Sequence, residues 1–205
     1  MTKFTVLVVC TGNICRSPLA EQLLRARFAE LAVPATVCSA GTRALAAQPM
    51  TPQAAALSLR YGAAEEVHTS QQLTEPLIVE ADLVLTASRE HRAEVVSLHP
   101  RAARYTFTLA QFARLAESHL EETVLIEHAV RGGGGPSDDS GETLRAYVAD
   151  IAAIRGFAPP LAHSDDDDIV DPYRRTQDIY DLSGQAVDKA VTVVCRGLAT
   201  ALGRS

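Results

Sequence analysis

Residues 10–18, which read CTGNICRSP, constrain the fold of this chain more than any other stretch. They follow an apolar run over residues 4–9, a pattern typical of a buried strand. They precede residues 19–31, in which apolar side chains recur on one helical face. Ser17 and Pro18 fit the N-cap and the first helical position. The sequence therefore predicts a strand, a short loop and a helix whose free N–H groups point at the loop.

A loop of this kind is an anion site, and its residue types predict a reactive one. We expect the backbone N–H groups of residues 11–16 to bind phosphate oxygens, and Arg16 to add a planar, bidentate donor. Cys10 lies near a helix N-terminus and an arginine, so its thiol should lose its proton easily and act as a nucleophile. The Ser17 hydroxyl is expected to hydrogen-bond the Cys10 sulfur and stabilise it as a leaving group. The other predicted phosphate-binding residues are Thr11, Gly12, Asn13, Ile14 and Cys15.

Strand-like and helix-like segments alternate along most of the chain. Strands are predicted at residues 4–9, 35–41, 81–86 and 105–107, and helices at 18–28, 51–61, 89–98, 109–116, 140–155 and 176–202. This alternation is typical of a parallel sheet with helices on both faces. We therefore predict an α/β fold of three layers, α/β/α, around a mostly four-stranded parallel sheet. Ligands of such sheets bind at the carboxyl ends of the strands, where residues 10–18 lie.

Two separated motifs resemble one known family. Residues 9–18, VCTGNICRSP, match the signature loop of the low-molecular-weight protein tyrosine phosphatases. Residues 171–173, DPY, resemble the general-acid loop of that family, in which the tyrosine is an aromatic wall of the cleft. The catalytic residues that the resemblance implies are Cys10, Arg16 and Asp171, with Tyr173 beside the substrate.

The same resemblance implies a support for the loop. Ser39 is expected to hold Asn13, and His68 is expected to buttress the loop. Gln71 stands where the family usually has an arginine, which is a departure. Residues 44–47, which border the cleft in the family, are small and apolar and lack an aromatic residue that would stack on a phosphotyrosine ring. The substrate preference within the family therefore stays open.

One long segment departs from the family pattern. The resemblance covers residues 3–115 and 166–202 and leaves about 117–165 as an insertion. Within it, residues 132–139 have the composition of a flexible linker, and residues 140–155 predict a helix with one apolar stripe. We weigh a helix packed on the surface of the core against a lid or partner-docking helix near the site. The apolar stripe favours the first.

The composition argues against several classes of function, among them nucleic-acid binding and metal binding. The 205 residues, 47% of them hydrophobic, fit a single phosphatase domain over residues 1–205. The net charge of −6 and the lack of a lysine and arginine cluster argue against a nucleic-acid partner. The four cysteines and six histidines show no paired ligand spacing, so we expect no metal and no other cofactor. No membrane span or secretory signal stands out, which predicts a cytoplasmic protein without a membrane partner.

The resemblance implies a metal-independent protein tyrosine phosphatase that works through a phosphocysteine intermediate. Its substrates would be phosphotyrosine-bearing proteins or small aryl phosphates. Arsenate reduction, which uses the same loop in a related branch, would need help from a low-molecular-weight thiol, because residues 88–100 lack the cysteines of a disulfide cascade. Protein arginine phosphatases carry threonine where this chain has Ile14, whose apolar side chain disfavours a guanidinium. The presence of all three catalytic residues argues against an inactive anion-binding regulator.

Overall fold

The structure of the protein is a computed structural model that describes residues 3–129, 139–158, 161–163 and 165–204. Side chains are described for all of these residues except 121–129. Most of the predicted glycine-rich linker, residues 132–138, lies outside the described residues.

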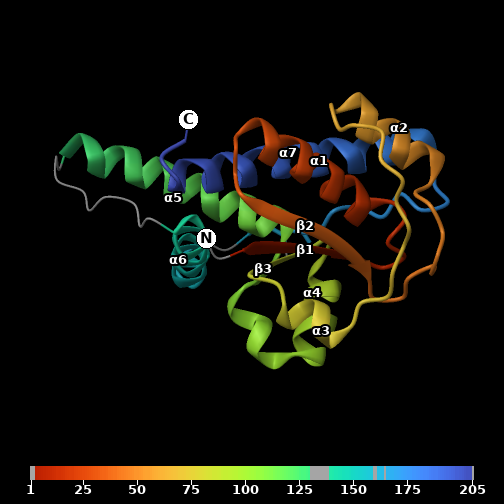
Figure 1. The fold of residues 1–205 in the computed structure, drawn as a ribbon, viewed down its shortest axis with the longest axis horizontal. Helices are drawn as coiled ribbons and strands as arrows, with labels where there is room; N and C mark the ends of the chain where they lie inside the picture. Colours follow the sequence, from red (N-terminus) through yellow and green to blue (C-terminus); the bar gives the residue numbers. More distant parts are fainter. Residues whose placement is uncertain (1–2, 130–138, 159–160, 164, 205) are drawn as a thin grey trace.

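A four-stranded parallel sheet lies at the centre of the described chain (Figure 1). In spatial order its strands are β2 (Ala35–Gly41), β1 (Phe4–Cys10), β3 (Leu83–Thr86) and β4 (Thr106–Thr108). In the register of the central strand, Val6 pairs with Val37 on one side and with Leu83 on the other. Residues 6–9 of β1 are apolar in succession, which is typical of a strand that is covered on both faces. The predicted α/β class with a parallel sheet is confirmed.

Helices cover both faces of this sheet. One face carries α1 (Arg16–Glu30), α5 (Leu109–Ala129) and α7 (Gln177–Ala201), with α2 (Pro52–Arg60) packed against α1 and α7. The other face carries α3 (Glu75–Val79), α4 (Arg89–Leu98) and the 3₁₀ helix η1 (Pro100–Arg104). Val6 and Val8 point into the core of the first face, and Leu7 and Val9 point into the core of the second. The side chains of β1 thus join three layers into one body, as the sequence predicts.

The first helix begins earlier than the sequence predicts. α1 starts at Arg16, and its N-cap is Cys15, whose side chain makes no capping hydrogen bond. The prediction of Ser17 as the N-cap was therefore wrong. Its hydroxyl instead contacts Cys10 and Asn13. Without a side-chain cap, the first N–H groups of α1 remain free to bind an anion in the loop.

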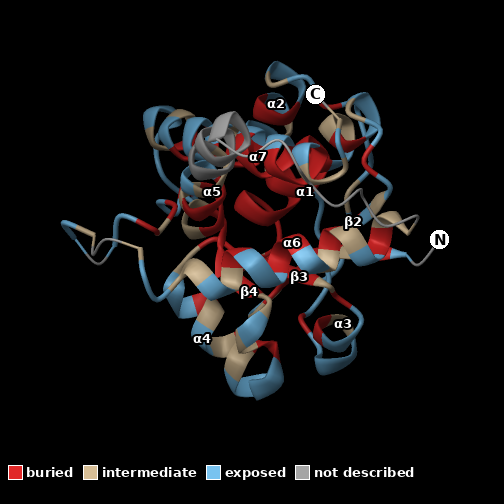
Figure 2. Cartoon of the chain, turned by 90° about the vertical axis from the view of Figure 1, so that its left-hand side faces the viewer, coloured by how far each residue is buried: buried red, intermediate tan, exposed pale blue. Residues whose placement is uncertain are grey.

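The predicted insertion is largely helical. α5 continues to Ala129, so the boundary expected near residue 117 falls inside a helix. α6 (Ser140–Ile154) begins after Asp139, whose side chain accepts a hydrogen bond from the Gly141 N–H. The buried side chains of α6 pack into the core that α5 and α7 share, and Figure 2 colours the helix by burial, with buried and exposed residues along it. The buried side chains belong to Leu144, Tyr147, Val148 and Ile151.

α6 lies at the end of the sheet opposite to residues 10–18. Arg145 Nη2 donates to the carbonyl oxygen of Lys3, just before β1, at 2.7 Å. Arg155 Nη2 donates to the carbonyl oxygen of Thr106, at the start of β4, at 3.1 Å. Residues 10–18 instead follow the carboxyl end of β1. The helix is therefore packed on the core as the sequence favours, and the alternative of a lid near the site was wrong.

Candidate active site

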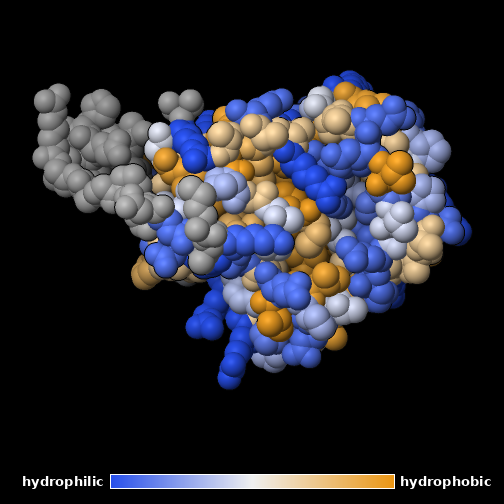
Figure 3. Space-filling view, viewed as in Figure 1, coloured by the Kyte–Doolittle hydropathy of each residue, from blue (hydrophilic) through white to orange (hydrophobic). Residues whose placement is uncertain are grey.

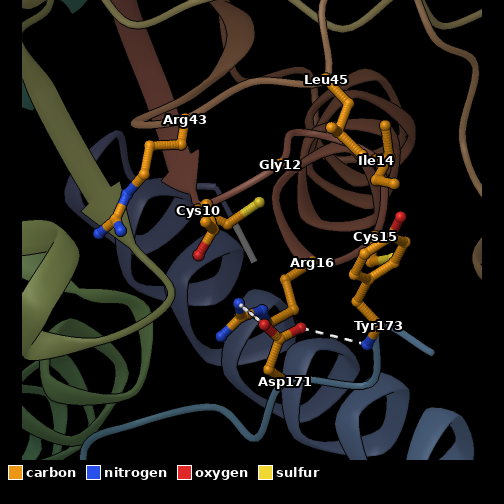
Figure 4. A pocket seen from close by; sticks show the side chains of 10 residues that line it. Cys10, Gly12, Ile14, Cys15, Arg16, Arg43, Leu45, Asp171 and Tyr173 are labelled. Atoms are coloured by element: carbon orange, nitrogen blue, oxygen red, sulfur yellow. Dashed lines mark hydrogen bonds and ion pairs between the residues drawn. The ribbon is translucent and has the colours of Figure 1, made fainter. Parts of the chain in front are cut away.

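Residues 10–18 surround a pocket of about 140 Å³ at the carboxyl end of β1 (Figure 4). Most of the predicted site residues line it, namely Cys10, Thr11, Gly12, Ile14, Cys15, Arg16, Asp171 and Tyr173. Arg43 and Leu45, from the segment after β2, complete the wall. Asn13 and Ser17 are fully buried and hold the loop from behind. The strand–loop–helix unit therefore gathers its polar groups around one small space.

The sulfur of Cys10 is held by the first turn of α1. Its Sγ lies 3.0 Å from the Ser17 Oγ. That hydroxyl accepts a hydrogen bond from Asn13 Nδ2 at 2.9 Å, which leaves its own proton to donate to the sulfur. A hydrogen bond to sulfur favours the thiolate over the thiol. The expected role of Ser17 thus has the geometry that it needs.

Arg16 joins the loop to the segment before α7. Its side chain is 6% exposed, and its Nη1 donates to the carbonyl oxygen of Ile169 at 3.1 Å. Its Nη2 lies 2.9 Å from Asp171 Oδ2, and this carboxylate is half exposed. The Nε of Arg16 is buried and has no hydrogen-bond partner among the described residues. Figure 4 shows the side chains of Arg16 and Asp171 next to each other, below Cys10 in this view.

Asn13 is the residue around which the loop is braced. Its φ of 55° is left-handed, a conformation that asparagine tolerates better than most residues. Its Nδ2 donates to the Ser39 Oγ at 2.7 Å, and its Oδ1 accepts from the Gln71 N–H at 2.9 Å. His68 Nε2 lies 2.7 Å from the Asn13 carbonyl oxygen. The contacts expected from Ser39 and His68 are therefore present, and a backbone N–H joins them.

The departure at Gln71 leaves the brace intact. Gln71 Nε2 donates to the Ser39 carbonyl oxygen at 2.9 Å, so glutamine still ties β2 to the segment between α2 and α3. Ser39 donates in turn to the buried carboxylate of Glu21 on α1. Gly41 allows the close approach, because a Cβ there would lie 2.5 Å from the Thr11 carbonyl oxygen. Residues from α1, from β2 and from the segment after α2 thus position residues 10–18.

Sequence reasoning missed His91, which fixes the side chain of Thr11. Thr11 Oγ1 lies 2.8 Å from His91 Nε2, and the Ser88 Oγ lies 2.7 Å from His91 Nδ1. Burial lowers the pKa of His91, and the positive charge of Arg16 lowers it further. The imidazole is therefore kept neutral beside the cationic arginine. His91 is one residue of an ordinary amphipathic helix, so its sequence context carries no signal for this role.

Tyr180 is the second missed residue, and it contacts Cys15. Cys15 Sγ lies 3.6 Å from the Tyr180 hydroxyl and 3.5 Å from Thr51 Oγ1. Burial is the main cause that raises the pKa of Cys15, and burial also raises the pKa of Tyr180 to about 12. Cys15 is therefore held as a neutral thiol at the pocket wall, unlike the expected thiolate of Cys10.

The pocket mouth has an apolar side and a charged side. Ile14, Leu45 and Tyr173 lie together on the right of Figure 4, and Arg43 lies across the pocket from them. Tyr173 is 37% exposed, and the Arg174 guanidinium lies 5.1 Å from the centre of its ring. Arg43 forms an exposed ion pair with Glu94 at 3.0 Å. The mouth can therefore accept a flat apolar group attached to an anion.

The described part of the chain holds neither a metal-binding cluster nor a membrane-spanning helix. No cluster of three or more histidine, cysteine, aspartate or glutamate side chains in the described ranges is arranged to hold a metal ion. In the same part of the chain, no helix combines the length and the apolarity that crossing a bilayer requires.

Comparisons with known proteins find a matching family and related sequences. The family described as low molecular weight phosphotyrosine protein phosphatase matches residues 5–124. A probable low molecular weight protein-tyrosine-phosphatase, EpsP of Ralstonia nicotianae, is 35% identical over 128 residues, which are 62% of this chain and 86% of that protein. The low molecular weight protein-tyrosine-phosphatase Etp of Escherichia coli K12 is 36% identical over 113 residues, 55% of this chain and 74% of its own.

Solved structures extend the likeness to the carboxyl-terminal part of the chain. The YwlE arginine phosphatase from Geobacillus stearothermophilus superposes with a TM-score of 0.64 at 25% identity and covers 96% of this chain and 94% of its own. Wzb of Vibrio vulnificus, solved in complex with benzylphosphonate, superposes with a TM-score of 0.61 at 25% identity and covers 94% of this chain and 97% of its own. The shared fold thus reaches beyond residue 124, where the family match ends.

Proposed function

The chain belongs to the low molecular weight phosphotyrosine protein phosphatase family, and we propose that it hydrolyses phosphotyrosine without a metal, through a phosphocysteine intermediate. One observation carries the proposal: Cys10, Arg16 and Asp171 line one pocket of about 140 Å³ at the carboxyl end of β1. This space suits a phosphoryl group, and the apolar wall at the mouth suits the attached ring.

In the first step the substrate phosphate takes the position that Asp171 holds beside Arg16. The Cys10 thiolate attacks phosphorus in line with the tyrosine oxygen, so an S–P bond forms and the P–O bond breaks. The loop N–H groups and Arg16 bind the equatorial oxygens, and one of these oxygens would satisfy the orphan Nε of Arg16. Asp171, released from Arg16, takes up a proton from solvent and gives it to the leaving phenolate.

In the second step water attacks the phosphocysteine. Asp171 is now a carboxylate and takes a proton from the water, while the S–P bond breaks and inorganic phosphate forms. The Ser17 hydroxyl, 3.0 Å from the sulfur, stabilises the departing thiolate. No external reductant or cofactor is needed, because Cys10 returns to its starting state.

A nucleophile that must remain a free thiol suits a reducing compartment. The described cysteines are all free. This supports a cytoplasmic location, with phosphotyrosine-bearing proteins or small aryl phosphates as substrates.

The test is phosphate release from a phosphotyrosine peptide in the presence of EDTA and a reducing agent. We expect the native protein to be active and Cys10→Ser to lose at least about 10³-fold in kcat. Cys38→Ser, which removes a thiol of β2 outside the pocket, is the matched control and should keep its rate. A native protein without activity, or a Cys10→Ser variant that stays active, would overturn the proposal.

Phosphoarginine is a second candidate substrate, favoured by the likeness to the YwlE arginine phosphatase. Ile14 lines the pocket and presents an apolar group where a guanidinium would sit. We therefore expect phosphotyrosine to be preferred, and Ile14→Thr to shift the ratio of kcat/KM values toward phosphoarginine. An unchanged ratio would show that this residue does not select between the two substrates.

A further inference from the structure

A second cavity lies far from the active site, where α6 faces η1 and Arg92 of α4. It is an open groove of about 940 Å³. One wall is the face of α6 that carries Val148, Ala149 and Ala152, and the other carries Tyr105. Figure 3 shows hydrophilic side chains beside apolar ones where α6 approaches the lower helices. The inserted helix therefore creates a concave surface as well as extending the core.

Four arginines line this groove, and only one of them is neutralised. Arg145 Nε forms an ion pair with Asp82 Oδ1 at 2.7 Å, and Asp82 is the only acidic residue in the lining. Arg92, Arg104 and Arg155 form no ion pair with any carboxylate of the described residues. Asp82 is further occupied by the Thr5 N–H, which donates to its Oδ2 at 2.8 Å. The groove therefore carries an excess of positive charge although the chain as a whole is acidic.

Arg92 and Arg155 are brought together on one backbone oxygen. Arg92 Nε donates to the Thr106 carbonyl oxygen at 3.0 Å, and Arg155 Nη2 donates to the same oxygen at 3.1 Å. Burial lowers the pKa of both arginines, and for Arg155, whose pKa falls to about 10, the charge of Arg92 adds to the effect. Two half-buried cations that repel each other cost free energy, and a bound anion would recover it.

The guanidinium of Arg155 is also fixed in orientation. It lies 3.8 Å above the centre of the Phe107 ring, and its Nη1 donates to the Ala103 carbonyl oxygen at 3.1 Å. Its Nε is buried and has no hydrogen-bond partner among the described side chains and backbone groups. A cation held in place before binding loses little side-chain entropy when an anion arrives. The Arg155 guanidinium is therefore preorganised for binding, unlike that of a flexible surface arginine.

We propose that the groove between α6 and η1 binds an organic phosphate, whose phosphate group contacts Arg92, Arg104 and Arg155 and whose apolar part lies on Val148, Ala149 and Ala152. Arginine donors in clusters match the oxygens of a phosphate, and three uncompensated charges suit a dianion. The small side chains of α6 leave room for a ring or a short chain above the arginines. The site is independent of the proposed hydrolysis, because Cys10 and Arg16 lie at the other end of the sheet.

The experiment is a titration of the full chain with phenylphosphonate, which has no P–O bond to a leaving group, followed by amide chemical shifts. The Ala149 and Ala152 amides report on the groove, and the Gly12 amide reports on the active site. We expect two independent saturation curves. Arg92→Gln and Arg104→Gln should each raise the Kd read from α6 by about tenfold or more and leave the Gly12 curve unchanged. Arg104 is exposed, so its variant keeps the test valid if Arg92→Gln disturbs α4.

Arg101→Gln is the matched control. Arg101 is an exposed arginine of the same 3₁₀ helix and lies outside the groove lining, so both curves should keep their native Kd. Inorganic phosphate as a second probe should bind the groove several-fold more weakly than phenylphosphonate, because it lacks the apolar part. Silent α6 amides, or the same α6 Kd in the native protein and in both groove variants, would overturn the site. Equal affinity for the two probes would overturn the apolar half of the proposal.

Discussion

The two ends of the parallel sheet are stabilised in different ways. At the carboxyl ends of the strands, residues 10–18 are held by buried hydrogen bonds from Ser39, Gln71 and His68, and their charges face an open pocket. At the amino ends, α6 is held by apolar side chains buried in the common core. Directed polar contacts fix the geometry of a reacting group, and apolar packing supplies most of the free energy of folding. Changes at the first end should therefore alter the reaction rate, and changes at the second should alter stability.

The largest effect should follow Asp171→Asn. Asparagine keeps the shape of the side chain but cannot give a proton to the leaving group, so kcat should fall by about 10²–10⁴-fold. The carboxylate is half exposed, so the free energy of unfolding should change by less than about 1 kcal/mol. Initial rates and urea unfolding measured on the same preparation would separate the two effects.

Leaving groups of different quality provide the control. The loss in rate should be larger with phenyl phosphate than with p-nitrophenyl phosphate, because a good leaving group departs without a proton. The same loss with both substrates would contradict the role of Asp171 as an acid.

The next effect concerns Asn13, a residue whose replacement should lower both the reaction rate and the free energy of unfolding. Asn13→Gly keeps the left-handed φ but removes the contacts with Ser39 and Gln71, and we expect a loss of about 2–3 kcal/mol in unfolding free energy. Asn13→Ala should lose about 1 kcal/mol more, because alanine does not favour that φ. Both variants should also lose activity. Thermal unfolding of the pair isolates the backbone contribution, and equal stabilities would show that the φ of Asn13 carries no strain.

Disturbing the contact between α6 and α7 should have a smaller effect, which lowers stability and leaves the reaction rate nearly unchanged. A Cβ at Gly197 would clash with the Tyr147 hydroxyl, so Gly197→Ala should lower the free energy of unfolding by about 1–3 kcal/mol while kcat stays within about twofold. The Tyr147 hydroxyl is buried without a partner among the described residues, so Tyr147→Phe alone should be neutral or slightly stabilising. The double variant should recover part of the loss. A large fall in kcat for Gly197→Ala would break the division between the two ends.

The smallest effect should be a pH dependence from His91. Its pKa is lowered in the folded protein, so the unfolded chain binds the additional proton first as the pH falls through the usual value near 6.5. The free energy of unfolding should therefore fall below that pH, and His91→Gln should show a smaller fall between pH 7.5 and 5.5. His163→Gln, at an exposed loop position, should keep the native dependence. Urea unfolding at the two pH values measures the difference, and identical pH dependences in the native protein and His91→Gln would refute the burial argument.

The sequence allowed the fold and the centre of the site to be predicted because both depend on local patterns. The centres of β1 and β3 are continuous apolar runs, and Cys10, Arg16 and Ser17 lie within eight residues of one another in the chain. The predicted N-cap failed because the Ser17 hydroxyl has two partners that lie outside the helix. His91 and Tyr180 were missed because packing between distant segments brings them to the loop. The same holds for Arg92, Arg104 and Arg155, which meet only after α6 has packed against the core.

The contacts of Asn13 also have a consequence for how the protein regains its activity. Ser39, His68 and Gln71 lie on β2 or on the segment that follows α2, so the pocket cannot take its final shape while β2 is apart from β1. Helices form on a shorter timescale than contacts between distant strands. In a refolding experiment, the far-ultraviolet circular dichroism signal should therefore return before the ability to turn over an aryl phosphate. The recovery of activity would therefore measure when the edge strand β2 pairs with β1.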